Sequence, residues 1–132
     1  MATRMAGKKA LTLSRSVAHG IYSITLPLLG GKPGPVNVYL FVGRDNITLL
    51  DTGISGTFSI LRRALAEHGL TCEDIDQIVV THSHVDHCGA AKKILRTSRS
   101  HIVVAGNFEK TVSLATGLGV SRRTVAAFLK LM

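Results

Sequence analysis

Residues 78–89 read Ile-Val-Val-Thr-His-Ser-His-Val-Asp-His-Cys-Gly, and this segment decides how the rest of the sequence is interpreted. The apolar run at 78–80 predicts a buried strand. The three histidines and the aspartate that follow should therefore lie in the turn at the carboxyl end of that strand. Open α/β sheets bind their ligands at this position. The segment thus places a dense group of polar side chains where a binding site is expected.

The polar residues of this segment are ligand types that zinc and related divalent metals accept in proteins. Residues two apart in an extended turn project to the same side, so His82 and His84 are predicted to bind one ion together. Asp86 and His87, where the chain bends into the next helix, are predicted to reach a second ion. A solvated polar loop is the alternative interpretation, and the density of ligand types favours the metal site.

The spacing His-x-His-x-Asp-His at 82–87, followed by Gly89, resembles the central motif of the metallo-β-lactamase fold superfamily. Leu-Leu-Asp-Thr-Gly at 49–53 is similar to the strand-end segment of these proteins, and Asn-Val-Tyr-Leu at 37–40 is similar to the strand before it. The resemblance extends from about residue 17 to about residue 109. It implies an α/β (α+β) fold, namely the N-terminal half of an αββα sandwich with a mixed or antiparallel sheet flanked by helices.

The resemblance also implies a metal-dependent hydrolase, with two zinc ions in a complete site or with iron or manganese instead. His82 and His84 would bind the first metal, and Asp86 and His87 the second. Asp86 would also act in catalysis, because it would orient the activated water or accept its proton. That water would attack an ester, thioester, lactone, lactam or related bond of a small-molecule substrate. Asp51 is expected beside the direct ligands, where it orients one of them, shapes the turn, or does both.

The chain has 132 residues, enough for one domain with a hydrophobic core. We expect residues 1–16 to form a basic, disordered tail and residues 17–132 to form a single metallo-β-lactamase-like domain. Proteins of this family are longer and are built from two similar halves, so the sequence is interpreted as truncated at its C-terminus. After His87 the sequence contains no aspartate and one histidine, His101. His101 begins a predicted strand and is not expected to replace the family's later ligands.

Two hypotheses about function therefore remain open. In the first, the chain is the N-terminal part of a hydrolase. In the second, it is a truncated, non-catalytic metal-binding or oligomerising half-domain with an incomplete site. Four ligands shared between two ions leave each ion with two, fewer than the four that zinc usually has in proteins. A homo-oligomer would complete the site or cover the exposed face of the sheet.

The composition disfavours nucleic acid and membranes as partners. The net charge of +8 comes from basic residues spread along the chain, and the six aromatic residues do not interleave with them as a base-stacking surface requires. Mean hydropathy is +0.28, but no apolar run approaches the roughly 20 residues that span a bilayer. The N-terminus lacks the apolar core of a secretory signal. We expect a cytoplasmic protein, with Cys88 as a buried neighbour of the motif rather than a ligand.

The spacing of apolar residues and of turn residues predicts the order of the elements. Strands are expected at 17–25, 36–42, 47–50, 78–80 and 102–105. Helices are expected at 55–68, 89–96, 108–115 and 121–132, with a short one starting at 71–74. Gly69 is expected to end the first helix in the left-handed conformation.

Overall fold

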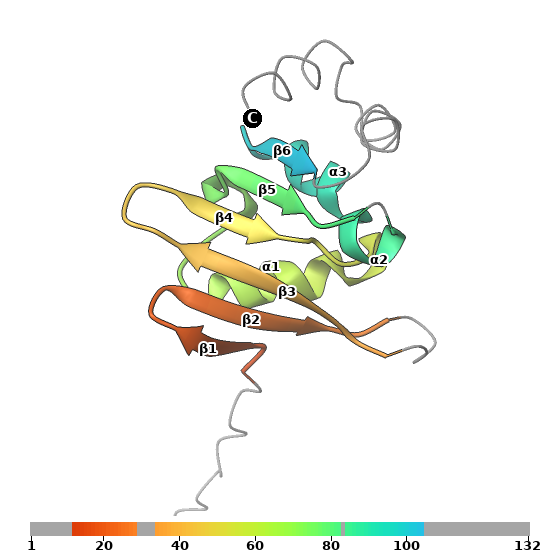
Figure 1. Ribbon diagram of the computed structural model, residues 1–132, viewed down its shortest axis with the longest axis horizontal. Helices are drawn as coiled ribbons and strands as arrows, with labels where there is room; N and C mark the ends of the chain where they lie inside the picture. Colours follow the sequence, from red (N-terminus) through yellow and green to blue (C-terminus); the bar gives the residue numbers. More distant parts are fainter. Residues whose placement is uncertain (1–11, 29–33, 83, 105–132) are drawn as a thin grey trace, which may run out of the picture.

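The computed structural model describes residues 12–28, 34–82 and 84–104. Within these ranges six strands form one sheet, whose spatial order is the order of the strands along the chain (Figure 1). The strands are β1 Ser14–Ala18, β2 Ile21–Leu26, β3 Val36–Val42, β4 Ile47–Leu50, β5 Gln77–Val80 and β6 His101–Val104. The helices are η1 Ser55–Thr57, α1 Phe58–Ala66, η2 Cys72–Asp74, α2 Val85–Cys88 and α3 Ala91–Leu95. The helices expected at 108–115 and 121–132 lie outside the described residues.

The sheet is mixed, which is one of the two arrangements that the resemblance implies. Strands β1 to β4 pair in antiparallel fashion, whereas β4 pairs with β5, and β5 with β6, in parallel. Because the carboxyl ends of parallel strands meet at one edge of a sheet, the residues after β4 and after β5 become neighbours. The backbone N–H of Asp51 donates to the carbonyl oxygen of Val79 at 2.7 Å. This pairing positions the predicted site.

One face of the sheet carries the hydrophobic core. Along β3 the side chains of Val36, Val38 and Leu40 are buried, while Asn37 between them is exposed. Their partners in register on the neighbouring strands are also buried, including Ile24, Leu49 and Ile78. Helix α1 lies behind this face in Figure 1 and contributes Leu61, Ala64 and Leu65, at the spacings of three and four predicted for its apolar side. Helix α3 adds Ile94 to the same cluster.

The opposite face carries a second row of apolar side chains. Tyr39, Leu50, Val79 and Val103 lie in register across β3, β4, β5 and β6, and all four are half-buried. Leu50 ends β4, and Val79 is the residue before the last of β5, so the row runs beside the predicted site. None of the helices in the described part of the chain is long and apolar enough to cross a bilayer.

Two expected elements differ from the structure. The strand expected at 17–25 is a hairpin, because the chain reverses at His19 and Gly20 between β1 and β2. Gly20 has φ +70, and a Cβ there would lie 2.7 Å from the carbonyl oxygen of Val42, so the turn requires glycine. The helix expected at 89–96 is shorter, because α3 spans Ala91–Leu95, and a separate short helix, α2, precedes it at Val85–Cys88.

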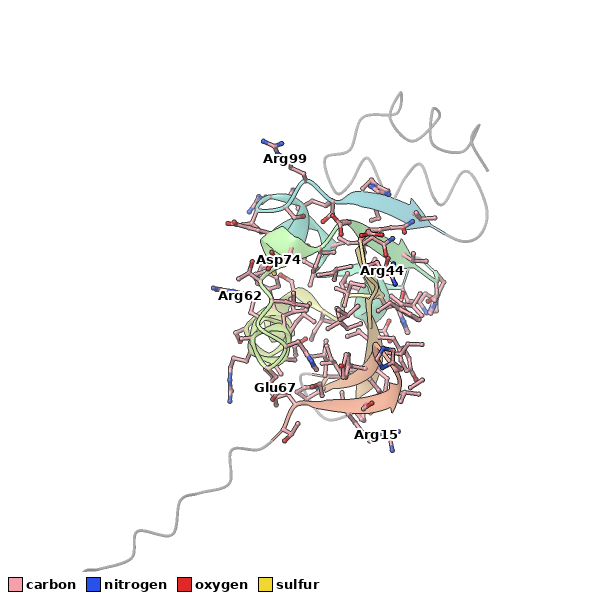
Figure 2. All side chains as sticks on the ribbon, turned by 90° about the vertical axis from the view of Figure 1, so that its left-hand side faces the viewer. Arg15, Arg44, Arg62, Glu67, Asp74 and Arg99 are labelled. Carbon is pink, nitrogen blue, oxygen red and sulfur yellow. The ribbon has the colours of Figure 1, made fainter. Side chains whose placement is uncertain are left out.

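Residues 14–16, at the end of the expected basic tail, belong to β1. Glu67, just after α1, anchors this strand near its first residues (Figure 2). Its Oε1 accepts the backbone N–H of Leu13 at 2.7 Å, and its Oε2 accepts the backbone N–H and the hydroxyl of Ser14 at 3.0 and 2.7 Å. The Ser14 hydroxyl also lies 2.8 Å from Nε2 of His68, whose ring packs against Tyr22.

The buried core allows a prediction of how much stability is lost when a large side chain is truncated within it. Leu49→Ala should lower the free energy of unfolding by about 2–5 kcal/mol, because Leu49 is fully buried between β3 and β5. Urea denaturation followed by circular dichroism measures this change. Val17→Ala, at a side chain that is 54% exposed, is the matched control and should change the free energy by less than about 0.5 kcal/mol. Equal losses in the two variants would contradict the assigned core.

The Glu67 contacts predict a pH-dependent attachment of β1. Burial acts to raise the pKa of Glu67, but the hydrogen bonds from Leu13 and Ser14 outweigh it, so the pKa is lowered. A lowered carboxyl pKa stabilises the fold at neutral pH, and this contribution is lost as the pH falls through the folded-state pKa. Glu67→Gln should therefore lower the protection of the Leu13 and Ser14 amides against hydrogen exchange at pH 7, and that protection should no longer fall as the pH is lowered. Glu73→Gln, at an exposed position, should leave both amides protected as before.

Candidate metal centre

The predicted ligands lie where β5 leads into α2. His82 lies two residues after β5, in a bend. His84 is the residue that caps the N-terminus of α2, in an extended conformation with φ −69 and ψ 142. Asp86 and His87 follow within α2 itself. Ser83, between the first two histidines, lies outside the described residues. The short helix therefore turns the last two side chains back toward the first two.

The three imidazoles are neighbours in space. The rings of His82 and His84 lie 4.6 Å apart between centroids, edge to face at 75°. The rings of His82 and His87 lie 4.0 Å apart, tilted at 45°. Nε2 of His87 is 3.5 Å from Oδ2 of Asp86. His82 thus contacts both of the other histidines, and the structure does not separate the four side chains into the two pairs expected from the sequence.

The donor set fits a divalent metal in its chemistry, but it is not arranged as a complete coordination site. Imidazole nitrogens and a carboxylate are ordinary zinc ligands. Among the described residues, however, no three histidine, cysteine, aspartate or glutamate side chains form a group that could hold a metal ion. The assignment of His82, His84, Asp86 and His87 as metal ligands therefore stays a prediction.

Asp51 lies beside His87, one of the predicted ligands. Its side chain is buried, and its backbone adopts the left-handed region with φ 62, which aspartate tolerates better than most residues. Oδ2 lies 2.8 Å from Nδ1 of His87. Oδ1 accepts the backbone N–H of Thr81 at 2.8 Å, and the Thr81 hydroxyl lies 2.8 Å from Oδ2. Asp51 therefore contacts a predicted ligand directly and also reaches the end of β5.

Backbone hydrogen bonds join the segment after β4 to the end of α2. The N–H of Thr52 donates to the carbonyl oxygen of His87 at 2.8 Å, and the N–H of Ala90 donates to the carbonyl oxygen of Gly53 at 3.0 Å. Thr52 is fully buried, and its hydroxyl accepts the Ala90 N–H at 3.2 Å. A Cβ on Gly89 would collide with the carbonyl oxygen of Val85 and crowd the backbone after Gly53. The glycine thus permits the close approach that holds Asp51 against His87.

Thr81 was not singled out by the sequence. Its hydroxyl touches both carboxylate oxygens of Asp51 and lies 2.9 Å from Nδ1 of His82. The only local signal is a hydroxyl residue between the strand and the first histidine. Its partner Asp51 is 30 residues away in sequence, so the contact depends on the parallel pairing of β4 with β5.

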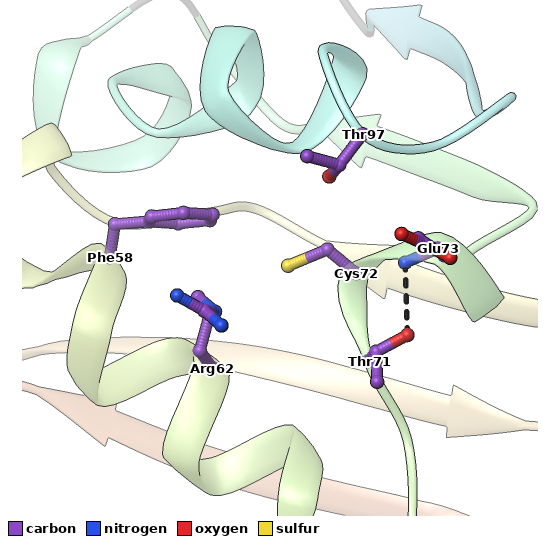
Figure 3. Close-up of a pocket in the computed structure, with 6 residues that line it drawn as sticks. All are labelled: Phe58, Arg62, Thr71, Cys72, Glu73 and Thr97. Atoms are coloured by element: carbon purple, nitrogen blue, oxygen red, sulfur yellow. Dashed lines mark hydrogen bonds between the residues drawn. The ribbon is translucent and has the colours of Figure 1, made fainter.

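The two cysteines lie in different surroundings and form no disulfide. Cys88 is buried next to the histidines, and burial raises the pKa of its thiol, with the Asp51 and Asp86 carboxylates acting in the same direction. Cys72 lines a hollow of about 340 Å³ whose lining includes none of the predicted metal ligands (Figure 3). Burial raises the pKa of the Cys72 thiol as well, against an opposing effect of Arg62. Both thiols are thereby disfavoured as thiolates.

The contacts of Asp51 predict the effect of removing its charge. Asp51→Asn keeps the shape of the side chain and tolerates the left-handed backbone, but its NH₂ group would face a donor on Thr81 or on His87. The free energy of unfolding should fall by about 1–3 kcal/mol, as for other buried groups left without a partner. Urea denaturation tests this, with Asp45→Asn at an exposed turn as the control. Indistinguishable unfolding curves for the two variants would show that the carboxylate does not hold these donors.

Comparisons with known proteins agree with the resemblance found in the sequence. The family model of the metallo-beta-lactamase superfamily matches residues 31–111. A probable metallo-hydrolase of Methanocaldococcus jannaschii is 50% identical over 62 residues, which are 47% of this chain and 29% of that protein. A metallo-beta-lactamase fold-containing protein of Sulfurisphaera tokodaii is 28% identical over 89 residues, which are 65% of this chain and 30% of that protein. The chain therefore spans less than a third of either relative's length.

Solved structures show the same fold. A metallo-beta-lactamase of Cronobacter sakazakii, carrying mutations in its HARLDQ motif, superposes with a TM-score of 0.63 at 19% identity, over 79% of this chain and 38% of that one. A metallo-beta-lactamase family protein of Thermus thermophilus gives a TM-score of 0.57 at 30% identity, over 63% of this chain and 28% of that one. The mixed sheet with flanking helices is thus the fold that these solved structures share with this chain. Because the family model matches more than half of its residues, the chain belongs to the metallo-beta-lactamase superfamily.

Proposed function

We propose that this chain supplies the histidine and aspartate cluster of a metal-dependent hydrolase, with zinc as the metal and a small molecule as the substrate. The observation that carries the proposal is the group of three neighbouring imidazoles, beside the buried Asp51 carboxylate, at the carboxyl ends of two parallel strands. Membership of the superfamily supports the same chemistry. The bond attacked would be an ester, thioester, lactone, lactam or related bond.

In this proposal His82, His84, Asp86 and His87 hold the metal. A bound divalent cation lowers the pKa of a water toward neutrality and polarises the carbonyl that is attacked. The Asp86 carboxylate is partly exposed and lies next to Nε2 of His87, so it can orient the attacking water or take its proton. Asp51 holds the His87 ring through Nδ1 and leaves Nε2 facing outward from that bond. The half-buried row beside the site, which includes Leu50 and Val79, would offer an apolar wall to the substrate.

A non-catalytic half-domain is the second candidate function. The observation that favours it is the absence of any three-donor metal group within residues 12–28, 34–82 and 84–104. In that case a second copy of the chain would bring further donors to the same ion, or would cover the apolar row on the open face. Metal would then be bound by a dimer, without turnover.

Elemental analysis of the purified chain tests the proposal. After expression with zinc and gel filtration, we expect zinc to copurify with the wild-type chain and its content to be clearly lower in His84→Ala, because one predicted ligand is removed. His19→Ala is the matched control, since His19 is exposed and lies outside the cluster, and its zinc content should equal that of the wild type.

The same samples separate the two functions. Zinc-dependent hydrolysis of a thioester or lactone panel that is lost in His84→Ala would support the hydrolase. Zinc bound only by a dimer, with no hydrolysis of any compound in the panel, would support the half-domain. Zinc content that is the same in all three proteins would overturn both, because the histidine cluster would then not be the metal site.

A further inference from the structure

We propose that Thr81 is a positioning residue that fixes the proton of His82 on Nδ1, so that Nε2 of His82 is left as a metal-binding lone pair, as Asp51 does for Nε2 of His87. The proposal deepens the proposed function, on which its consequence for metal binding rests. The proton positions are those of the metal-free protein. The proposal follows from the hydrogen-bond contacts among four side chains: Asp51, Thr81, His82 and His87.

The hydrogen bonds around the Asp51 carboxylate decide which ring nitrogens carry a proton. The Asp51 carboxylate carries only acceptors, and it faces the backbone N–H of Thr81 on Oδ1 and Nδ1 of His87 on Oδ2, both at 2.8 Å. Nδ1 of His87 must therefore carry a proton. In its neutral form the imidazole has one N–H and one bare nitrogen, so Nε2 of the neutral His87 ring keeps its lone pair, with Oδ2 of Asp86 at 3.5 Å from it.

The contacts of the Thr81 hydroxyl decide where the proton of His82 lies. Its oxygen lies 2.8 and 3.1 Å from the two oxygens of Asp51, and a hydroxyl has one proton. If that proton pointed elsewhere, lone pairs of Thr81 and Asp51 would face each other at hydrogen-bond distance. The hydroxyl therefore donates to Asp51, and its remaining lone pairs face Nδ1 of His82 at 2.9 Å. Nδ1 of His82 must then carry a proton too.

The position of Thr81 makes this assignment rigid. Its backbone N–H and its hydroxyl both bind Asp51, and its β-branched side chain has few rotamers. Asp51 is itself fixed on the other side, because its backbone N–H donates to the carbonyl oxygen of Val79. One buried carboxylate thus orients His87 directly and His82 through a hydroxyl. Groups that fix a ligand histidine in this way set its tautomer and ring orientation.

The test replaces the hydroxyl alone. Thr81→Val keeps the branched shape and the backbone N–H bonded to Asp51, so the Asp51–His87 contact should be unchanged. Thr81→Ser is the matched control, since it restores the hydroxyl. Ring-nitrogen tautomers are read from long-range ¹H–¹⁵N NMR spectra of the metal-free, full-length chain at a pH where the rings are neutral. In the wild type and in Thr81→Ser we expect the proton of His82 on Nδ1. In Thr81→Val we expect a mixture that shifts toward Nε2–H, with His87 unchanged.

Zinc affinity gives a second measurement. Competition with a chromophoric chelator should show about 10–100-fold weaker zinc binding for Thr81→Val, and binding close to wild type for Thr81→Ser, the usual size of such effects around a metal. A wild-type His82 with its proton on Nε2 would overturn the proposal by itself, even if the Val variant did not fold. An unchanged tautomer in a folded Thr81→Val protein would overturn it as well. If the tautomers are as expected and no zinc binds to the wild type, the proposed function fails while the role of Thr81 in the metal-free protein stands.

Discussion

The buried carboxylate of Asp51 is the contact on which the arrangement of this site depends. It accepts hydrogen bonds from the end of β5 through Thr81 and from α2 through His87, while its own backbone is paired with β5. This one side chain therefore holds together the segment after β4, the end of β5 and the short helix α2. A buried acceptor with several donors is strongly favoured over one that loses a partner. The strand ends and the short helix are thus fixed relative to one another before any ligand is present.

The stability of the fold and the geometry of the site come from different parts of the sheet. Strands β2 to β5 and helices α1 and α3 form the hydrophobic core on one face. The site occupies the edge where the parallel strands end, and its polar contacts add orientation rather than buried apolar area. Charge is spread over the surface: Figure 2 shows Arg15, Arg44, Arg62 and Arg99 at separate places on the molecule. This distribution is consistent with the expectation that nucleic acid is not a partner, which stays a prediction.

The histidine cluster is assembled without being a closed metal site. The His82 ring lies 4.6 Å from the His84 ring and 4.0 Å from the His87 ring, yet no three donors among the described residues surround one point. In each of the four proteins compared, the matched region covers less than two-fifths of that protein's own chain. Under either proposed function, donors from outside the described residues are therefore needed to complete a metal site. The Asp51 and Thr81 contacts orient the donors that are present.

Local apolar spacing and a dense motif at one strand end were enough to predict the order of the elements from β3 to β5, the helix α1 and the family. The sequence also indicated that Asp51 is a residue to look for beside the predicted ligands. It did not determine the hairpin at Gly20, the start of β1 or the role of Thr81. These features were decided by contacts between residues distant in the chain: Gly20 against Val42, Ser14 against Glu67, and Thr81 against Asp51. Spacing along a sequence predicts which face a side chain occupies, whereas only the packed sheet decides which distant polar group it meets.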